Sequence, residues 1–438
     1  MSTENTEKKS VFKSFPFNYW VVILMEFFER GSYYGVTSVI YVYMVLKLNE
    51  GGLGFTKESV GLIKSTITPL LYILPILSGA IADRYGYRIT LMFAFIVMSA
   101  GYFLTGLSTD YTFVFLSLIL MVTGAGFFKP IISGTIARTT DKSNSTLGFG
   151  IFYWSINLGA FIFPLILVPF LKQYSYSYIF FMASIVTGSL LLLNLFVYKE
   201  PTKLDKTSNR SLIDVLKDAL VVLKDVRFVT LIVLYSGFWV LYFQMFDTVL
   251  WYMQRFVDTT VISGVVNSFL GLFMTNPQWK FDVEHVTVIN AGTIILLQIL
   301  VSNIVKNKKS LPTMITGIGI GTCGMAILAI STSPWVFLAG ITIFSIGEMT
   351  THPKFISYVG LIAPPDKKAL YLGYAFLYGV IGGGISGILG ANLYVKFIDS
   401  AATPQPHLLW LSLSSIGVVS MVGLFLFNKF LAPKNSDI

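Results

Sequence analysis

The stretch FPFNYWVVILMEFFERGSYYGVTSVIYVYMVL, residues 15–46, is apolar and long enough to cross a membrane, yet it holds three formal charges near its middle. A charge near the centre of a bilayer costs about 2.5 to 3.5 kcal/mol on insertion scales, so such charges usually line the path of an ion or a substrate. Helical spacing gathers five polar residues on one face: Glu26, Glu29, Arg30, Tyr33 and Thr37. We therefore predict that this polar stripe faces a cavity. A salt bridge that only holds two helices together is the structural alternative.

The composition of the whole chain agrees with a membrane protein. A mean hydropathy of +0.72, with 54% hydrophobic and 12% charged residues, is incompatible with a water-soluble globule of 438 residues. Twelve apolar runs are long enough to span a bilayer: 16–46, 58–82, 89–108, 112–138, 146–171, 176–198, 227–256, 286–305, 312–331, 334–361, 369–396 and 407–431. The sequence thus predicts an all-α polytopic membrane protein with twelve transmembrane helices. The basic N-terminal segment has no small-residue cleavage site, so we expect no removable signal peptide.

The positions of Lys and Arg predict how the chain is oriented. Short loops rich in these residues stay on the cytoplasmic side. With the N-terminus inside, 21 of the 31 Lys and Arg residues fall in cytoplasmic segments and six in outer ones. We therefore expect both termini in the cytoplasm and a multi-pass protein of the cytoplasmic membrane. Topology explains the net charge of +9, so nucleic acid is not an expected partner.

One connecting segment divides the chain into two sets of six spans. It contains seven basic residues: Lys199, Lys203, Lys206, Arg210, Lys217, Lys224 and Arg227. We predict an N-terminal six-helix bundle over 1–198, a cytoplasmic linker over 199–226 and a C-terminal six-helix bundle over 227–438. Within the linker, Ser211 to Asp225 has apolar residues at helical spacing and predicts an amphipathic surface helix. The apolar run Val261 to Met274 fits either an interfacial helix or an extension of the seventh span.

The ionisable residues inside the spans follow a pattern. Besides the first span, the fourth, seventh and tenth spans hold Lys129, Asp247 and Glu348. Twelve spans with a basic central linker resemble the major facilitator fold, in which these four helices line the central cavity. Acidic and basic residues balance within the spans: Glu26, Glu29, Asp247 and Glu348 against Arg30, Lys64, Lys129 and Lys354. A channel would more often repeat one sign of charge around a ring, so paired opposite charges favour alternating access.

A loop after the second span carries a further resemblance. Residues 79–88, GAIADRYGYR, look like the GxxxDRxGxR loop of the major facilitator superfamily. We expect Asp83 and Arg84 to contribute to gating, because carboxylate and guanidinium groups can cap helix ends and bond across the cytoplasmic face. A purely topological role for the arginines is the alternative.

Four stretches resemble a narrower family, the proton-dependent oligopeptide transporters. The first is the ExxER motif at residues 26–30, followed by Tyr33-Tyr34-Gly35. The second is GAGFFKP at residues 124–130, and the third is FYWSINLG at residues 152–159, similar to the FYxxINxG signature. The fourth is Gly347-Glu348 with Pro353. Their order and their positions on the spans indicate this family.

The resemblance implies roles for individual residues. It implies that four residues take part in proton coupling: Glu26, Glu29, Lys129 and Glu348. Arg30 and Lys129 would face the carboxylate of the substrate, and Glu348 its amino group. Further substrate contacts are expected from Tyr33, Tyr34, Tyr72, Asn157 and Trp239. For each aromatic residue taken singly, core or lipid packing is the alternative, since the chain has 37 Phe and 23 Tyr.

The chain departs from the family pattern at two positions. Many members carry a second arginine where this chain has Thr37, and an acidic residue where it has Phe243. These two charges are understood to pair at the outer gate, so the loss of both leaves neither unpaired. We predict that Lys64 and Asp247 form a replacement gate pair. His352, one turn from Glu348, would relay or tune its proton, or else serve as a structural histidine.

No motif for another chemistry stands out. We found no GxxxxGK[ST] loop, no metal-ligand spacing and no nucleophile arrangement, so we expect neither an enzyme nor a cofactor or metal. The predicted function is import of di- or tripeptides, or of peptide-like solutes, by a monomeric proton-coupled symporter with the lipid bilayer as its surroundings. The alternatives are a carrier of another small anion or zwitterion, such as an amino acid, nitrate or a peptidomimetic, and a non-transporting solute sensor on the same fold.

Overall fold

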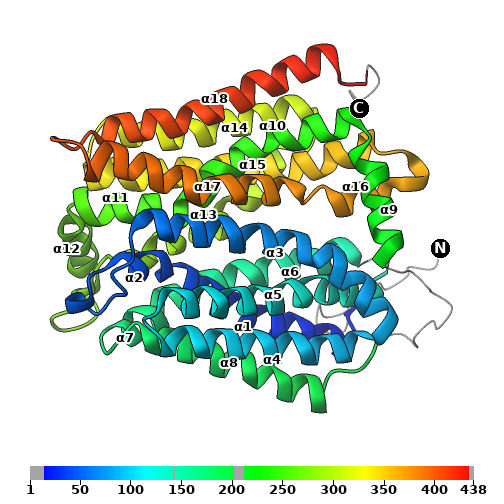
Figure 1. Cartoon of the computed structure of the whole chain (residues 1–438), viewed down its shortest axis with the longest axis horizontal. Coiled ribbons are helices and arrows are strands. Elements are labelled where there is room, and N and C mark those ends of the chain that lie inside the picture. The colour runs from blue at the N-terminus through cyan, green and yellow to red at the C-terminus, as the bar shows by residue number, and fades with distance from the viewer. Residues whose placement is uncertain (1–13, 142–143, 202–211, 434–438) are drawn as a thin grey trace, which may run out of the picture.

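The computed structural model describes residues 14–141, 144–201 and 212–433. The long helices lie roughly parallel to one another, and no β-strand occurs in the described ranges (Figure 1). The fold is therefore all-α, as predicted. Parts of two predicted segments lie outside these ranges. They are the basic N-terminal residues and the linker residues Lys203, Lys206, Arg210 and Ser211.

The first half of the chain contains helices that pack mainly on one another. They are α1 (Phe17–Thr37), α2 (Ile40–Val45), α3 (Lys57–Tyr85), α4 (Tyr87–Leu107), α5 (Tyr111–Thr139), α6 (Ser145–Ile162), α7 (Val168–Lys172) and α8 (Ser177–Phe196). A wider π-helical turn, η3 (Phe163–Leu167), joins α6 to α7, and a short 3-10 turn, η2 (Leu48–Glu50), follows α2. The principal contacts in this half pair α4 with α5 and α8, α3 with α5, and α1 with α6 and α8.

The second half repeats this plan. Its helices are α10 (Val226–Phe243), α11 (Thr248–Phe256), α12 (Thr259–Leu270), α13 (Glu284–Val305), α14 (Ser310–Ala326), α15 (Pro334–Ile362), α16 (Lys368–Tyr374), α17 (Leu377–Tyr394) and α18 (Pro406–Phe430). Short turns of other pitch connect them: η4 (Gln244–Phe246), η5 (Ile327–Ala329), η6 (Pro365–Lys367) and η7 (Val395–Asp399). The principal contacts pair α14 with α15 and α18, α10 with α17 and α18, and α13 with α15.

The two halves meet along two seams, α3 against α17 and α6 against α13. Glycines make the first seam narrow. A Cβ atom added to Gly387 would lie 2.4 Å from the Gly61 carbonyl oxygen, and one added to Gly383 would lie 2.5 Å from the side chain of Thr68. The glycines of α17 thus form a face for close helix packing. The exact bundle boundaries at residues 198 and 227 stay predictions.

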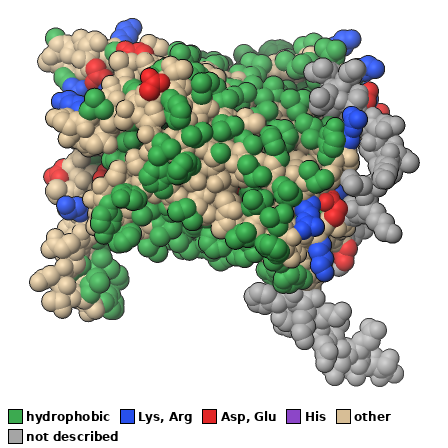
Figure 2. All heavy atoms as spheres, turned by 60° about the horizontal axis from the view of Figure 1, so that its bottom comes forward, with side chains coloured by type: hydrophobic (Ala, Val, Ile, Leu, Met, Phe, Trp, Pro, Cys, Tyr) green, Lys and Arg blue, Asp and Glu red, His purple; other side chains and the backbone are tan. Residues whose placement is uncertain are grey.

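Within the described ranges, ten helical segments are long and apolar enough to cross a membrane. α1 and α15, of 21 and 29 residues, hold the charged groups of the first and tenth predicted spans, and including them would give the twelve spans predicted. Hydrophobic side chains cover the middle of the visible face, and charged side chains gather toward its two ends (Figure 2). This belt is typical of a multi-pass membrane protein.

Three predicted spans are interrupted within the described residues. The first breaks between α1 and α2, the seventh at η4, between α10 and α11, and the eleventh between α16 and α17. In the seventh span, the Asp247 amide bonds to the Gln244 carbonyl, and the Asp247 carboxylate accepts a hydrogen bond from the Thr248 amide at 2.7 Å. Asp247 therefore caps a new helix inside the span, which hydropathy alone does not reveal.

The linker between the halves and the connection after α11 each contain a separate helix. α9 (Leu212–Leu223) lies within the predicted linker and contacts α3, α10 and α16. α12 is divided from α11 by Val257 and Asp258, whose carboxylate accepts a hydrogen bond from the Thr260 amide, so this segment is not an extension of the seventh span. The two helices lie at opposite ends of the molecule, here called the α9 end and the α12 end (Figure 1).

Candidate functional site

The ExxER motif forms a buried charge cluster on α1. The Arg30 guanidinium donates two hydrogen bonds to the Glu29 carboxylate, at 2.5 and 2.6 Å, and its Nε lies 3.6 Å from a Glu26 oxygen. All three residues are at most 5% exposed. Lys129 of α5 lies within electrostatic reach of the three. The cluster therefore combines two acidic and two basic groups, and it satisfies the condition that buried charges be paired.

A cavity of about 490 Å³ adjoins this cluster. Its lining comes from both halves of the chain: Arg30, Tyr33, Tyr34, Thr37, Tyr41, Lys64, Thr68, Leu71, Tyr72, Lys129, Tyr242, Phe243 and Phe246. The polar stripe predicted on α1 thus does face a cavity, through Arg30, Tyr33 and Thr37. Glu29 is fully buried behind Arg30, and Glu26 is not among the lining residues.

Cations face aromatic rings in this cavity. The Arg30 guanidinium carbon lies 4.8 Å from the centre of the Tyr33 ring, and the Lys129 ammonium lies 5.2 Å from the centre of the Tyr72 ring. Such contacts stabilise a desolvated cation without neutralising it. These contacts hold Arg30 and Lys129 at the surface of the cavity, where an anionic ligand can meet them.

The cavity is bounded by a buried ion pair between the halves. Lys64 of α3 lies 2.6 Å from the Asp247 carboxylate, and the two side chains are 2% and 1% exposed. The Lys64 ammonium also donates to the Phe243 carbonyl at 2.5 Å. The break in the seventh span makes this possible, because the Asp247 amide no longer bonds to that carbonyl as it would in a continuous α-helix. The predicted pair therefore exists in the structure, and its gating role stays a prediction.

Two further ion clusters link the halves at the α12 end. Lys172 at the end of α7 lies 2.7 Å from Asp282 and 2.5 Å from Glu284, and Glu284 is buried. Asp399 lies 2.8 Å from Lys57 and 2.6 Å from Arg255, all three partly exposed. Sequence analysis missed both clusters, because these residues fall at the ends of apolar runs, where charges are expected for topological reasons alone. Three ion clusters thus join the two halves at the α12 end among the described residues.

Glu348 of α15 lies apart from the charge cluster. It accepts a hydrogen bond from Asn290 of α13 at 3.0 Å, and Asn290 also donates to Ser345 at 2.9 Å. Glu348 is within electrostatic reach of Tyr34 and Tyr242, which line the cavity. The sequence did not predict a functional role for Asn290. Its position as a polar residue near the start of an apolar run was the only feature that could have indicated one.

Among the described residues, His352 makes its side-chain contacts away from Glu348. Its Nδ1 lies 3.2 Å from the Tyr235 hydroxyl, and its ring packs edge-on against Trp239 with 5.4 Å between centroids. This geometry favours the structural alternative over a proton relay. Lys354, expected to balance an acidic residue, instead donates to the Lys308 carbonyl at 2.6 Å, so this expectation was wrong.

Trp239 and Asn157, two further residues predicted to contact substrate, lie in different surroundings. Trp239 is 5% exposed, stacks on Tyr378 at 4.4 Å between centroids and packs against Tyr242. It thus supports the aromatic wall of the cavity from behind. The Asn157 amide donates to the Tyr153 carbonyl of its own helix at 2.9 Å, which occupies one of its donors. Direct contact of Asn157 or Trp239 with substrate stays a prediction.

The loop after α3 bonds within its own half. Asp83 lies 3.4 Å from Arg138 of α5, both side chains being more than a third exposed, and Arg84 lies over Tyr85. Arg88 donates to the carbonyls of Asn194 and Leu195 at the end of α8, as predicted for a helix-capping arginine. The proposed gating by Asp83 and Arg84 gains no interhalf contact among the described residues and stays a prediction.

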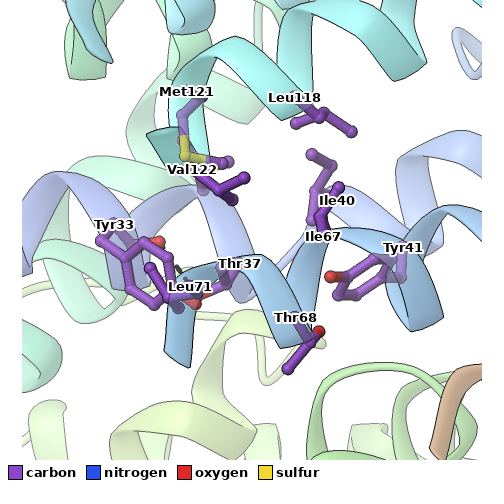
Figure 3. A pocket seen from close by; sticks show the side chains of 11 residues that line it. Tyr33, Thr37, Ile40, Tyr41, Ile67, Thr68, Leu71, Leu118, Met121 and Val122 are labelled. Carbon is purple, nitrogen blue, oxygen red and sulfur yellow. Dashed lines mark hydrogen bonds between the residues drawn. The ribbon is translucent and has the colours of Figure 1, made fainter. Parts of the chain in front are cut away.

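A second, smaller cavity opens beside the first. This side pocket, of about 320 Å³, lies between α1, α2, α3 and α5 (Figure 3). It is lined by Tyr33, Val36, Thr37, Ile40, Tyr41, Ile67, Thr68, Leu71, Leu118, Met121 and Val122. Sequence analysis did not predict it, because its apolar residues have the spacing of ordinary helix packing.

Known proteins share this architecture. The Major Facilitator Superfamily pattern matches residues 22–387. An uncharacterized transporter of Bacillus subtilis is 31% identical over 164 residues, which are 37% of this chain and 33% of that protein. Dipeptide and tripeptide permease B of Aliivibrio fischeri is 31% identical over 182 residues, 41% of this chain and 35% of the permease. The matched segments thus span about a third of the length of these curated relatives.

Solved structures match over almost the whole chain. A crystal structure of a POT family transporter in complex with 5-aminolevulinic acid superposes with a TM-score of 0.78, covering 95% of this chain and 97% of that one at 21% identity. At this identity the likeness shows the fold. The chain therefore belongs to the Major Facilitator Superfamily.

Proposed function

We propose that the chain is a proton-coupled symporter that imports di- or tripeptides by alternating access. The observation that carries the proposal is the buried cluster of Glu26, Glu29, Arg30 and Lys129 beside a cavity lined by both halves. The names of curated relatives, which include dipeptide and tripeptide permeases, support the substrate class.

Competition for Arg30 would couple substrate to proton. The guanidinium binds Glu29 through two hydrogen bonds, and a substrate carboxylate has the same planar shape and charge. When the substrate takes one or both of these bonds, Glu29 loses its partner in a desolvated site. Protonation is the least costly way to remove the unpaired charge, because the protonation of buried groups follows their neighbours. A proton and a substrate would therefore enter together.

The amino group of the substrate would lie toward Glu348. This carboxylate belongs to the second half of the chain, whereas Arg30 and Lys129 belong to the first. A zwitterionic ligand could thus bridge the halves, which would favour their rearrangement when it binds. Asn290, which bonds Glu348, acts as a positioning residue in this proposal.

The α12 end would face the cell exterior and the α9 end the cytoplasm. The Lys and Arg distribution supports this orientation, since most basic residues lie in segments at the α9 end. With its three interhalf ion clusters at the α12 end, the structure corresponds to a state closed toward the outside. We infer a monomeric protein of the cytoplasmic membrane, in which Lys64 and Asp247 act as the outer gate.

One feature supports a second candidate, a carrier of the same family for another small anion or zwitterion. Thr37 and Phe243, which replace the usual gate charges, both line the cavity. The cavity therefore carries fewer charges than the family pattern implies, which would change the preferred ligand.

Uptake by proteoliposomes with an imposed inward proton gradient tests these proposals. The peptide symporter predicts gradient-driven accumulation of labelled dialanine that unlabelled dialanine, but not nitrate or alanine, inhibits. Accumulation of nitrate or alanine without competition by dialanine would favour the second candidate. Binding with no gradient-driven uptake would identify a sensor and refute transport.

A further inference from the structure

We propose that α12 and the turn after it, residues 259–274, insert into the membrane leaflet at the α12 end. The partner is the apolar, acyl-chain side of the lipid interface rather than a charged headgroup. Insertion would anchor the outermost part of the second half in the lipid. The inference uses the membrane class and the fold of the chain and is independent of the transported solute.

The sequence of this segment suits an apolar surrounding. Residues 259–279 contain no Asp, Glu, Lys, Arg or His. Large apolar side chains recur every three or four positions along one face of α12, and this face continues into the turn after it: Val261, Val265, Phe269, Leu272 and Phe273. A helix with such a face needs an apolar partner on that side.

The chain itself covers only the opposite face of α12. Ile262 is buried, and the Asn267 side chain exchanges two hydrogen bonds with the Trp279 backbone, at 2.8 and 2.9 Å. In contrast, Phe269, Leu272 and Phe273 are 61%, 75% and 77% exposed, and the two phenyl rings pack edge to face with 5.5 Å between centroids. The fold therefore fixes α12 with its apolar face turned outward, and contiguous exposed apolar groups of this kind mark a contact surface.

The position of α12 identifies lipid as the occupant of that surface. α12 runs crosswise to the long helices at its end of the molecule (Figure 1) and packs against α15. The N-terminal part of α15 lies at this end, since Phe337 packs on Tyr252 of α11, and Trp335 in its first turn is half exposed. Exposed tryptophans at the ends of spans mark the boundary between hydrocarbon and headgroups. The face of α12 thus continues the hydrophobic belt at the depth where interfacial helices lie.

An anchor at this position would act on the ion cluster of Lys172. The Ser263 hydroxyl of α12 accepts a hydrogen bond from the Phe281 amide at 2.9 Å, and Asp282 and Glu284, which bind Lys172, follow directly in the chain. With α12 held in the leaflet, the two carboxylates of the second half keep a fixed depth. Lys172 of the first half would then approach or leave them when the halves rearrange.

The test locates α12 relative to lipid with an environment-sensitive fluorophore on single cysteines. The full-length protein carries Cys323→Ser, which removes its one natural cysteine, and is reconstituted in phosphatidylcholine vesicles. The label is placed at Phe273→Cys, at Leu296→Cys as the lipid reference on α13, and at Glu50→Cys as the matched water reference at the α12 end. All three positions are exposed on the protein. Quenching is measured with nitroxide on the lipid acyl chains and with iodide in the water.

We expect the Phe273→Cys label to follow the Leu296→Cys label, with blue-shifted emission, strong quenching by the lipid nitroxide and little by iodide. Quenching by iodide to the extent seen at Glu50→Cys would overturn the proposal. Shielding from both quenchers, with self-quenching between neighbouring molecules, would show that a second copy covers the face and would overturn it too. Quenching by the lipid nitroxide that requires anionic lipid would refute the apolar nature of the contact.

A second pair of substitutions tests whether the apolar side chains hold the segment in the leaflet. Phe269→Ser and Leu272→Ser are added to the labelled Phe273→Cys protein. Each lost side chain should weaken insertion roughly tenfold, so the label should move from lipid toward water. Unchanged quenching would mean that packing on the protein alone sets the position of α12, which would refute its role as an anchor.

Discussion

The buried pair of Lys64 and Asp247 allows a quantitative prediction. Asp247→Asn removes the negative charge but keeps a side-chain oxygen that can cap α11 at Thr248. The Lys64 ammonium, 2% exposed, then keeps the Phe243 carbonyl as its close polar partner among the described residues. Removing one partner of a buried ion pair costs about 3 to 5 kcal/mol. Because the Phe243 carbonyl still accepts a hydrogen bond from Lys64, we expect a cost at the lower end of this range, about 3 kcal/mol.

A cost of about 3 kcal/mol to the state closed at the α12 end lowers its population relative to the open state on the order of a hundredfold, since each 1.4 kcal/mol is a factor of ten. We therefore expect Asp247→Asn to reduce proton-driven uptake of dialanine by at least tenfold and to lower the unfolding temperature of the purified protein. Both effects are measured on the same preparation, by uptake in proteoliposomes and by intrinsic fluorescence on heating.

The double variant Lys64→Met with Asp247→Asn removes the unpaired charge and should recover most of the lost stability and uptake. Its matched control is Asp399→Asn, which breaks partly exposed ion pairs at the same end and should cost about 1 kcal/mol or less. Strictly additive effects of the Lys64 and Asp247 changes, or an equal effect of Asp399→Asn, would refute the reasoning.

Three further predictions follow from other contacts. Arg30→Lys keeps the charge but loses the two-point bond to Glu29, so the half-saturating dialanine concentration in uptake assays should rise at least tenfold; an unchanged value would contradict recognition by the guanidinium. Gly387→Ala puts a methyl group 2.4 Å from the Gly61 carbonyl oxygen, so thermal unfolding should show a loss of about 1 to 3 kcal/mol, and a neutral change would mean that the seam is looser than the structure shows. Lys172→Met leaves Asp282 and the buried Glu284 without their shared cation and should destabilise the protein more at pH 8 than at pH 4, because acid can protonate a buried carboxylate and so remove the unpaired charge; an equal loss of melting temperature at the two pH values would oppose this.

The departures at Thr37 and Phe243 acquire a physical meaning in the structure. Both residues lie at the cavity, where Lys64 meets the Phe243 backbone carbonyl and the carboxylate of Asp247. The cation at this place thus comes from α3 instead of α1. Sequence comparison detects that two charges are missing, but only the packing of α3 against η4 shows how their place is filled.

Helix positions were largely predictable because each helix in a bilayer satisfies its own backbone hydrogen bonds, so length and hydropathy suffice. The breaks after Thr37 and at Asp247 were not predicted. At Asp247 the carboxylate accepts a hydrogen bond from the Thr248 amide, and Lys64 donates to the Phe243 carbonyl, so these side chains offset the lost helical bonds. The sequence predicted α9 as a helix and α12 as an apolar segment. That both are separate from the membrane spans became clear only from the course of the backbone.

The amino-acid sequence by itself determined the membrane class, the two halves and the residues that carry charge, because hydrophobicity and charge are properties of each residue alone. The three-dimensional arrangement decided which of these charges meet. Arg30 with Glu29 was readable from adjacency on α1, whereas Lys172 with Glu284 and Glu348 with Asn290 join helices brought together only by folding. The side pocket also belongs to the tertiary structure, since an unfilled space between helices depends on how side chains pack and leaves no pattern along the chain.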